Sequence, residues 1–224
     1  MFKKAIFISL LVLSGIITYA QRIIRKIPLT KDDKSKGIIS KYEYLPKHIY
    51  HVATTLTLYK SSKYEYYEDN IPQPFYSIGK WRMNKKNLIL NSNLQQNEVP
   101  IKIKYIIDSS VDKITKFSEV YDSKRNTYIY AYVLVNNDST ICNPSLLFCK
   151  GSYIKIDSVK VLFGDRMCSK WIKVEDNPFQ RLQFIIDTDE NVIAYIPMHN
   201  KIFVFKGDTI SINWSPLPPL RPSW

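Results

Sequence analysis

The stretch Thr55-Leu56-Thr57-Leu58-Tyr59 indicates the fold class, and Ile101-Lys102-Ile103-Lys104-Tyr105 repeats its pattern. In both stretches, apolar side chains alternate with polar ones. Successive side chains of a β-strand point to opposite faces, so this alternation predicts strands that bury one face and expose the other. Tyr, Ile, Val, Phe and Thr, which suit a pleated surface, are abundant along the whole chain. The sequence therefore predicts an all-β protein.

Longer segments extend this prediction. Residues 128–135 are apolar at nearly every position, which predicts a central strand covered on both faces. Polar turns predict two hairpins, one between residues 182–186 and 192–196 and one between residues 202–205 and 209–214.

Residues 110–123 carry two patterns. Apolar side chains recur every three or four residues after a Ser109-x-x-Asp112 pair, as in a short capped helix. From Phe117 to Tyr121, however, the side chains also alternate as they do in a strand. A short helix and a strand both stay open for this segment.

Residues 1–20 have the layout of a cleavable signal peptide. Lys3 and Lys4 precede an apolar run, and Thr18-Tyr19-Ala20 ends it with small residues at the positions that a signal peptidase reads. The run is shorter than the roughly 20 residues of a spanning helix. We therefore expect a secreted or periplasmic protein that begins at Gln21 and keeps no stable membrane span after cleavage.

The rest of the chain divides into three parts. The texture changes near residues 97–100 from turn-rich hairpins to longer strands. We expect an N-terminal antiparallel β module in residues 21–98 and a C-terminal β-sandwich in residues 99–214. Residues 215–224 form a proline-rich tail, which we expect to lie extended because proline cannot pair as an inner strand.

The net charge and the expected export of the chain limit the classes of binding partner. The formal net charge is +12, but an exported chain rarely meets nucleic acid. Anionic envelope polymers, lipid headgroups or another envelope protein are the expected partners. Lys102 and Lys104 alternate with apolar neighbours, which is typical of the solvated face of a strand.

Cysteine spacing predicts one disulfide. The chain has three cysteines, and an oxidising compartment allows a bond between two of them. Cys142 and Cys149 flank a short loop that contains Pro144, so we predict that they bond to each other. Cys168 is left over, and the absence of a Cys-x-x-Cys pair disfavours zinc.

Motifs for catalysis are weak. His48-x-x-His51 lacks the glutamate and the spacing of a zinc protease helix, and Asp187-Thr188-Asp189 lacks the glycine of the aspartic protease loop. Six glycines leave little room for a nucleophile elbow, a phosphate loop or a dinucleotide fingerprint. We predict no catalytic residue, no metal site and no cofactor.

Two resemblances are visible. The order Leu56-x-Leu58, Ser77-x-Gly79-x-Trp81 and Leu88-x-Leu90 resembles a pattern in small, mostly uncharacterised exported bacterial β proteins. It implies that Gly79 lets the backbone bend while Trp81 plugs one end of a sheet. Lipocalins carry a similar Gly-x-Trp in their first strand. Because this pair comes late, we do not expect a full ligand-binding barrel.

The second half resembles the transthyretin-like sandwich, which also occurs as the regulatory-like domain of carboxypeptidases. Residues 130–135, 151–156 and 159–161 carry this resemblance. It implies a scaffold or an adhesive module, and no catalytic residue carries over from it.

Tyrosines supply the candidate binding residues. Tyr128, Tyr130 and Tyr132 share one strand face, and Tyr64 and Tyr66 share another. Exposed aromatic rows bind sugar rings or protein partners, whereas buried ones fill a core. Both alternatives stay open. We expect an exported, non-enzymatic β protein with a binding or structural role at the cell envelope. The alternative is a glycan hydrolase whose carboxylates the sequence does not locate.

Overall fold

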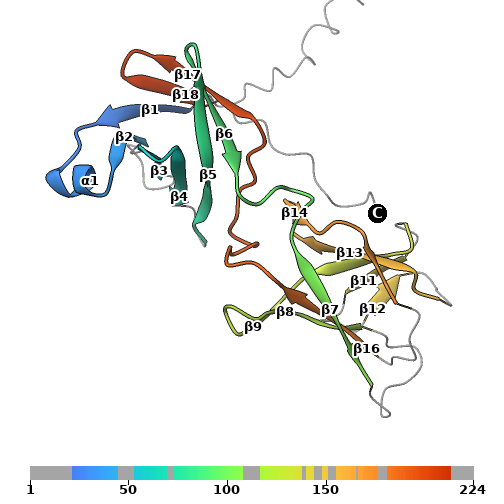
Figure 1. Ribbon diagram of the computed structural model, residues 1–224. Helices are drawn as coiled ribbons and strands as arrows, with labels where there is room; N and C mark the ends of the chain where they lie inside the picture. The colour runs from blue at the N-terminus through green and yellow to red at the C-terminus, as the bar shows by residue number, and fades with distance from the viewer. Residues whose placement is uncertain are drawn as a thin grey trace, which may run out of the picture.

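The computed structural model describes residues 22–44, 53–69, 73–107, 117–137, 140–143, 148–150, 155–164, 166–175 and 181–212 of the 224-residue chain. Within these ranges the regular structure is almost entirely β-strand, which confirms the all-β prediction. Figure 1 shows two β modules. The chain passes from the first module into the second and then returns to the first.

The first module is a closed antiparallel barrel with the strand order β1-β18-β17-β6-β5-β4-β3-β2. Its strands are β1 (Arg22–Ile27), β2 (Ile38–Tyr44), β3 (Ala53–Tyr59), β4 (Lys63–Asp69), β5 (Phe75–Asn84), β6 (Asn87–Ser92), β17 (Lys201–Lys206) and β18 (Thr209–Ile212). Closure leaves no strand edge of this sheet unpaired. The late Gly-x-Trp pair predicts no full ligand-binding barrel. The module nevertheless closes, because β17 and β18 from the far end of the sequence complete its sheet.

A short helix, α1 (Lys31–Ser35), connects β1 to β2. Thr30 and Asp33 cap it reciprocally: the Asp33 main-chain N–H donates to Thr30 Oγ1 at 3.0 Å, and the Thr30 N–H donates to Asp33 Oδ2 at 2.8 Å. The Thr30-x-x-Asp33 spacing carried this signal, and our sequence analysis missed it.

Side chains fill the barrel interior. Leu56, Leu88 and Phe203 are fully buried there. Tyr64 and Tyr66 are 0% and 1% exposed, and burial raises the pKa of Tyr64. These two tyrosines are therefore part of the barrel core and form no exposed face.

Gly79 and Trp81 lie where β5 pairs with its neighbours. A Cβ added to Gly79 would lie 2.0 Å from the Asn91 carbonyl oxygen, so only glycine permits this approach of β5 to β6. Trp81 is partly buried and packs against the barrel core. Its Nε1 donates to the Tyr59 carbonyl at 3.1 Å, and its main-chain N–H donates to that of Ser62 at 2.8 Å. Trp81 thus ties β5 to the turn between β3 and β4.

The second module consists of two sheets packed on a shared core. One sheet has the order β7 (Ile101–Ile106), β16 (Arg181–Ile186), β8 (Phe117–Asp122) and β9 (Thr127–Ile129). The other has the order β12 (Phe148–Lys150), β11 (Thr140–Asn143), β10 (Tyr132–Val135), β13 (Ser158–Phe163) and β14 (Met167–Cys168), with β15 (Ile172–Lys173) also paired to β13. Val120 and Phe184 of the first sheet join Val133 and Val161 of the second in one buried cluster. The predicted β-sandwich is confirmed.

The segment predicted as one central strand is divided between the two sheets. β9 belongs to one sheet and β10 to the other, and Tyr130 and Ala131 connect them. Only β10 is covered on both faces: Val133 joins the sandwich core, and Leu134 packs into a separate cluster on the opposite face. The prediction holds for residues 132–135 and was wrong for the residues before them.

The predicted hairpin of residues 182–186 and 192–196 does not form. β16 is already paired on both sides, with β7 antiparallel and β8 parallel, so it has no free edge for a hairpin partner. Residues 192–196 bond to the barrel instead: the Tyr76 N–H donates to the Ala194 carbonyl at 2.9 Å, and the Ile196 N–H donates to the Tyr76 carbonyl at 2.8 Å.

In the segment of residues 110–123, the described part is a strand. β8 spans Phe117–Asp122 and pairs with β16 and β9, so the strand alternative holds there and the helix does not. The expected start of the helix lies outside the described residues.

The second predicted hairpin forms, but it belongs to the barrel. β17 pairs with β18, and these two strands also pair with β6 and β1. Its place in the sequence predicts that this hairpin belongs to the C-terminal sandwich of residues 99–214. The strand pairing instead makes the sandwich an insertion between β6 and β17 (Figure 1).

Candidate functional site

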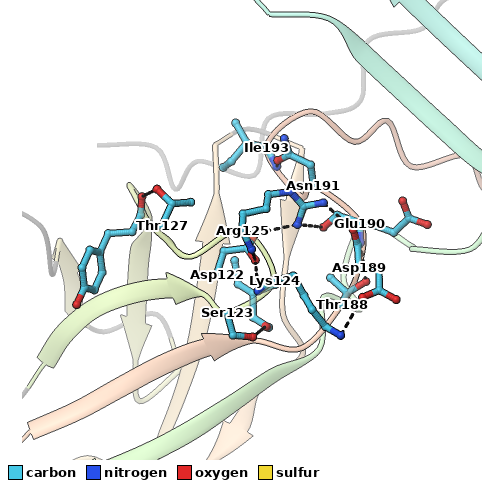
Figure 2. Close-up of polar contacts among 12 residues, drawn as sticks. Asp122, Ser123, Lys124, Arg125, Thr127, Thr188, Asp189, Glu190, Asn191 and Ile193 are labelled. Atoms are coloured by element: carbon cyan, nitrogen blue, oxygen red, sulfur yellow. Dashed lines mark hydrogen bonds and ion pairs between the residues drawn. The ribbon is translucent and has the colours of Figure 1, made fainter.

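Residues 187–194, which we call the linker loop, carry the chain from β16 toward the barrel. The turn between β8 and β9 holds this loop (Figure 2). Arg125 Nη2 donates to the Asp189 carbonyl at 2.6 Å, and Nη1 donates to the Glu190 carbonyl at 3.3 Å. Lys124 Nζ lies 3.0 Å from Asp189 Oδ1, and this bond raises the pKa of Lys124. The two cations together fix the first half of the loop.

Asp122, at the end of β8, positions Lys124 and Arg125 through hydrogen bonds. Its carboxylate is fully buried, and Oδ1 accepts the main-chain N–H groups of Lys124 and Arg125, both at 3.0 Å. Oδ2 accepts from Arg125 Nη1 at 2.9 Å. Asn126 follows with a φ of 52°, a left-handed conformation that asparagine tolerates well. A buried carboxylate needs such partners, so the turn is well specified by its contacts.

Tyr76 of β5 ties the same loop to the barrel. Its hydroxyl donates to Glu190 Oε2 at 3.0 Å and accepts the Asn191 main-chain N–H at 2.6 Å. The Tyr76 ring also packs edge to face on Tyr195, with centroids 5.3 Å apart. Burial, together with the Glu190 carboxylate, raises the pKa of Tyr76 to about 12, so its hydroxyl stays protonated at neutral pH.

A cleft of about 670 Å³ opens between the outer face of the barrel and the linker loop. β4 and β5 supply most of its lining, and the loop closes the other side. The lining residues are Glu65, Tyr66, Tyr67, Gln73, Pro74, Tyr76, Ile78, Asn191 and Ala194.

Glu65 is the ionisable carboxyl among the described residues of this lining. Lys63 Nζ donates to its Oε1 at 2.7 Å, and the Tyr59 hydroxyl donates to its Oε2 at 2.8 Å. Partial burial opposes ionisation, but these two hydrogen bonds outweigh it, so the pKa of Glu65 lies below its usual value. At neutral pH Glu65 is therefore a carboxylate paired with an ammonium group.

Four tyrosines form a second feature, on the sandwich, which we call the tyrosine row: Tyr121, Tyr128, Tyr130 and Tyr132. Tyr128 and Tyr130 are 58% and 52% exposed. The rings of Tyr121 and Tyr128 lie 5.3 Å apart, and those of Tyr130 and Tyr132 lie 5.5 Å apart, centroid to centroid. The Tyr130 and Tyr132 hydroxyl oxygens are 3.0 Å apart. Tyr128 lies in β9 and Tyr132 in β10, which belong to different sheets, so the three predicted tyrosines do not lie on one strand. They form two ring pairs instead, Tyr121 with Tyr128 and Tyr130 with Tyr132.

The cysteines lie in the other sheet of the sandwich. β11 and β12 pair antiparallel with Cys142 directly opposite Cys149. Cys142 is disulfide-bonded. Cys168 is a buried, reduced thiol whose Sγ donates to Asn97 Oδ1 at 2.9 Å. Directly opposed residues of antiparallel strands have Cα atoms about 4.5–5.5 Å apart, within the range of a disulfide. This register supports the predicted pair.

Other sequence candidates lie outside the described residues, including His48, His51, residues 1–20 and residues 215–224. In the described part of the chain, no group of three or more His, Cys, Asp and Glu side chains is placed to hold a metal ion. Among the same residues, no helix has the length and apolar character needed to span a membrane.

No local signal in the sequence identifies the residues that hold the cleft. The Asp187-Thr188-Asp189 run predicts a hairpin turn, and it indicates no contact of this loop with Arg125 or Tyr76. An alternating pattern shows only which strand face is wet, and Glu65 and Tyr67 lie on such a face of β4. What covers that face depends on the return of the chain from the sandwich.

Comparison of the chain with models of known families, with curated proteins and with solved structures finds no match.

Proposed function

We propose that this chain is an exported, non-enzymatic binding protein of the cell envelope whose binding face is the tyrosine row. The strong exposure of Tyr128 and Tyr130 carries this proposal. Large aromatic rings are usually buried in a core, so two rings left mostly in water within three residues of the chain favour a surface that a partner covers. Ring contacts with Tyr121 and Tyr132 restrict their motion, which lowers the entropy lost on binding.

The proposed ligand is an anionic glycan of the envelope. Sugar rings present apolar C–H faces that stack on tyrosine, and tyrosine hydroxyls bond to sugar hydroxyls. The chain that begins at Gln21 lacks Lys3 and Lys4, so its formal net charge is +12 minus 2, or +10, which attracts a polyanion to the molecule as a whole. Export itself is proposed from the layout of residues 1–20, which precedes a chain with a disulfide-bonded Cys142.

The charge state of Glu65 argues against the glycan hydrolase alternative at the cleft. A glycosidase needs two facing carboxyls, one of which has a raised pKa so that it acts as an acid. Glu65 is the carboxyl among the described lining residues, and its pKa is lowered rather than raised. This supports binding over hydrolysis.

The test is a binding titration of the chain beginning at Gln21 with uronic-acid and sulfated polysaccharides and with isolated envelope fractions. We expect the double variant Tyr128→Ala, Tyr130→Ala to lose roughly tenfold or more in affinity, because two stacking rings are removed. Changing both residues to Phe should preserve most of the affinity. Added salt should weaken binding in every variant.

Ile202→Ala is the matched control, because Ile202 is 50% exposed and lies on the barrel. It should bind as the unmodified chain does. Unchanged affinity in the double alanine variant would contradict the proposal, as would the absence of binding to every polysaccharide and envelope fraction.

A further inference from the structure

The cleft between β4, β5 and the linker loop lies apart from the tyrosine row. None of its lining residues belongs to the row. Its volume of about 670 Å³ falls within the roughly 300–1,000 Å³ that is typical of small-ligand sites. Arg125 and Tyr76 fix the loop wall from two sides, so the walls are preorganised.

Aromatic and polar groups share the lining. Tyr67 is 44% exposed and lies directly across β4 and β5 from Tyr76, so two tyrosines neighbour each other on the barrel surface. Glu65 and Gln73 add a carboxylate and an amide. Aromatic rings beside a carboxylate and an amide suit a ligand with both apolar faces and hydroxyl groups.

The charged side chain among the described lining residues of the cleft is already paired. The Glu65 carboxylate is paired with Lys63, so neither a net anion nor a net cation gains an uncompensated partner from them. An anionic ligand would also approach the Glu190 carboxylate behind Tyr76. A neutral ligand fits best, even though the molecule as a whole is basic.

Main-chain groups of the barrel wall are already engaged. β4 pairs with β3 and β5, and β5 pairs with β4 and β6, all antiparallel. Neither strand offers an edge on which an extended peptide could add as a further strand. Recognition at this site therefore falls to side chains.

We propose that this cleft is a second binding site, for a neutral oligosaccharide. One sugar ring stacks on Tyr67, and its neighbouring hydroxyls bond to the Glu65 carboxylate and the Gln73 amide. The site is independent of the tyrosine row, so a neutral glycan and a polyanion bind at once.

The test uses isothermal titration calorimetry with three neutral probes: cellohexaose, maltohexaose and the hexamer of N-acetylglucosamine. We expect at least one probe to bind, and Tyr67→Ala to weaken its binding roughly tenfold because the stacking ring is lost. Tyr67→Phe should keep the affinity within about threefold, since only a hydroxyl is removed. Tyr67 is a surface side chain, so all variants should melt at the same temperature.

The double variant Tyr128→Ala, Tyr130→Ala separates this site from the tyrosine row and should bind the neutral probe with unchanged affinity. If that variant loses the neutral probe while Tyr67→Ala keeps it, the cleft proposal is overturned and the tyrosine row is the sugar site. Failure of all three probes at millimolar concentration would also overturn it. A uronic-acid polysaccharide whose binding depends on Tyr67 would overturn the assignment to neutral ligands.

Discussion

Gly79 and Trp81 stabilise the barrel in opposite ways: the first has no side chain and lets two strands approach, and the second packs a large ring against the core. The backbones of β5 and β6 approach each other so closely at Gly79 that a single added carbon meets the Asn91 carbonyl. The Trp81 indole covers part of the barrel core and bonds to the turn before β4. The Ser77-x-Gly79-x-Trp81 spacing predicted a structural plug because a small residue beside a large aromatic one is typical of a crowded sheet.

We expect Trp81→Ala to lower the free energy of unfolding by about 3 kcal/mol, from lost core packing together with a lost hydrogen bond. Thermal and urea unfolding would measure this. Ile107→Ala is the control, because Ile107 is 80% exposed, and its effect should stay within about 0.5 kcal/mol. If Trp81→Ala melts like the unmodified chain and loses glycan binding, then Trp81 is a binding platform and the plug interpretation is wrong.

Among the elements, β11 and β12 form a short pair whose register sets the cysteines opposite each other. Proximity in sequence suggested Cys142 and Cys149 as partners, and the strand register places their Cα atoms directly opposite each other. Cys168 lies in β14, where its main-chain N–H and carbonyl bond to the segment that leaves the barrel.

We predict that denatured, unreduced protein takes up one alkylating group, at Cys168, and that reduced protein takes up three. Peptide mass spectrometry would locate the labels. The double variant Cys142→Ser, Cys149→Ser should lose about 2–3 kcal/mol of stability, as expected for a disulfide that closes so short a loop. Labelling of Cys142 or Cys149 without reduction would show that the bond is absent.

The linker loop shows why an element predicted from local signals took another form. Its polar run from Asp187 resembled a hairpin turn, and the residues after it had an apolar pattern. β16 had no free edge, however, and Tyr76 supplied main-chain partners on the barrel. The cleft forms because residues 192–196 bond to Tyr76 on the barrel instead of pairing with β16.

At the scale of the whole molecule, the barrel depends on strands from both ends of the described chain. β17 and β18 close it by pairing with β6 and β1, and the sandwich is inserted between β6 and β17. Without the last two strands, β1 and β6 would each present an unpaired edge.

Deleting residues 201–224 should therefore abolish cooperative unfolding of the barrel and lead to aggregation, as measured by thermal melting and size-exclusion chromatography. Deleting residues 215–224 is the control, because that deletion leaves β17 and β18 intact, and it should keep the melting temperature. If the longer deletion also melts cooperatively near the original temperature, residues 21–98 fold without closure, as the sequence alone suggested.

The sequence by itself determined the fold class and the candidate tyrosines. Alternation at Leu56 and Leu58 is a local property, because one strand's pleat decides which side chains share a face. The sequence could not determine which tyrosines are exposed. Tyr64 and Tyr128 each begin a Tyr-x-Tyr pattern, yet the first is buried in a closed barrel and the second lies at the surface. Barrel closure, the clamp of Arg125 on the linker loop and the cleft beside Tyr67 were decided by the tertiary structure. Each of them joins residues far apart in the chain, and a local pattern carries no information about which distant strand or loop will arrive.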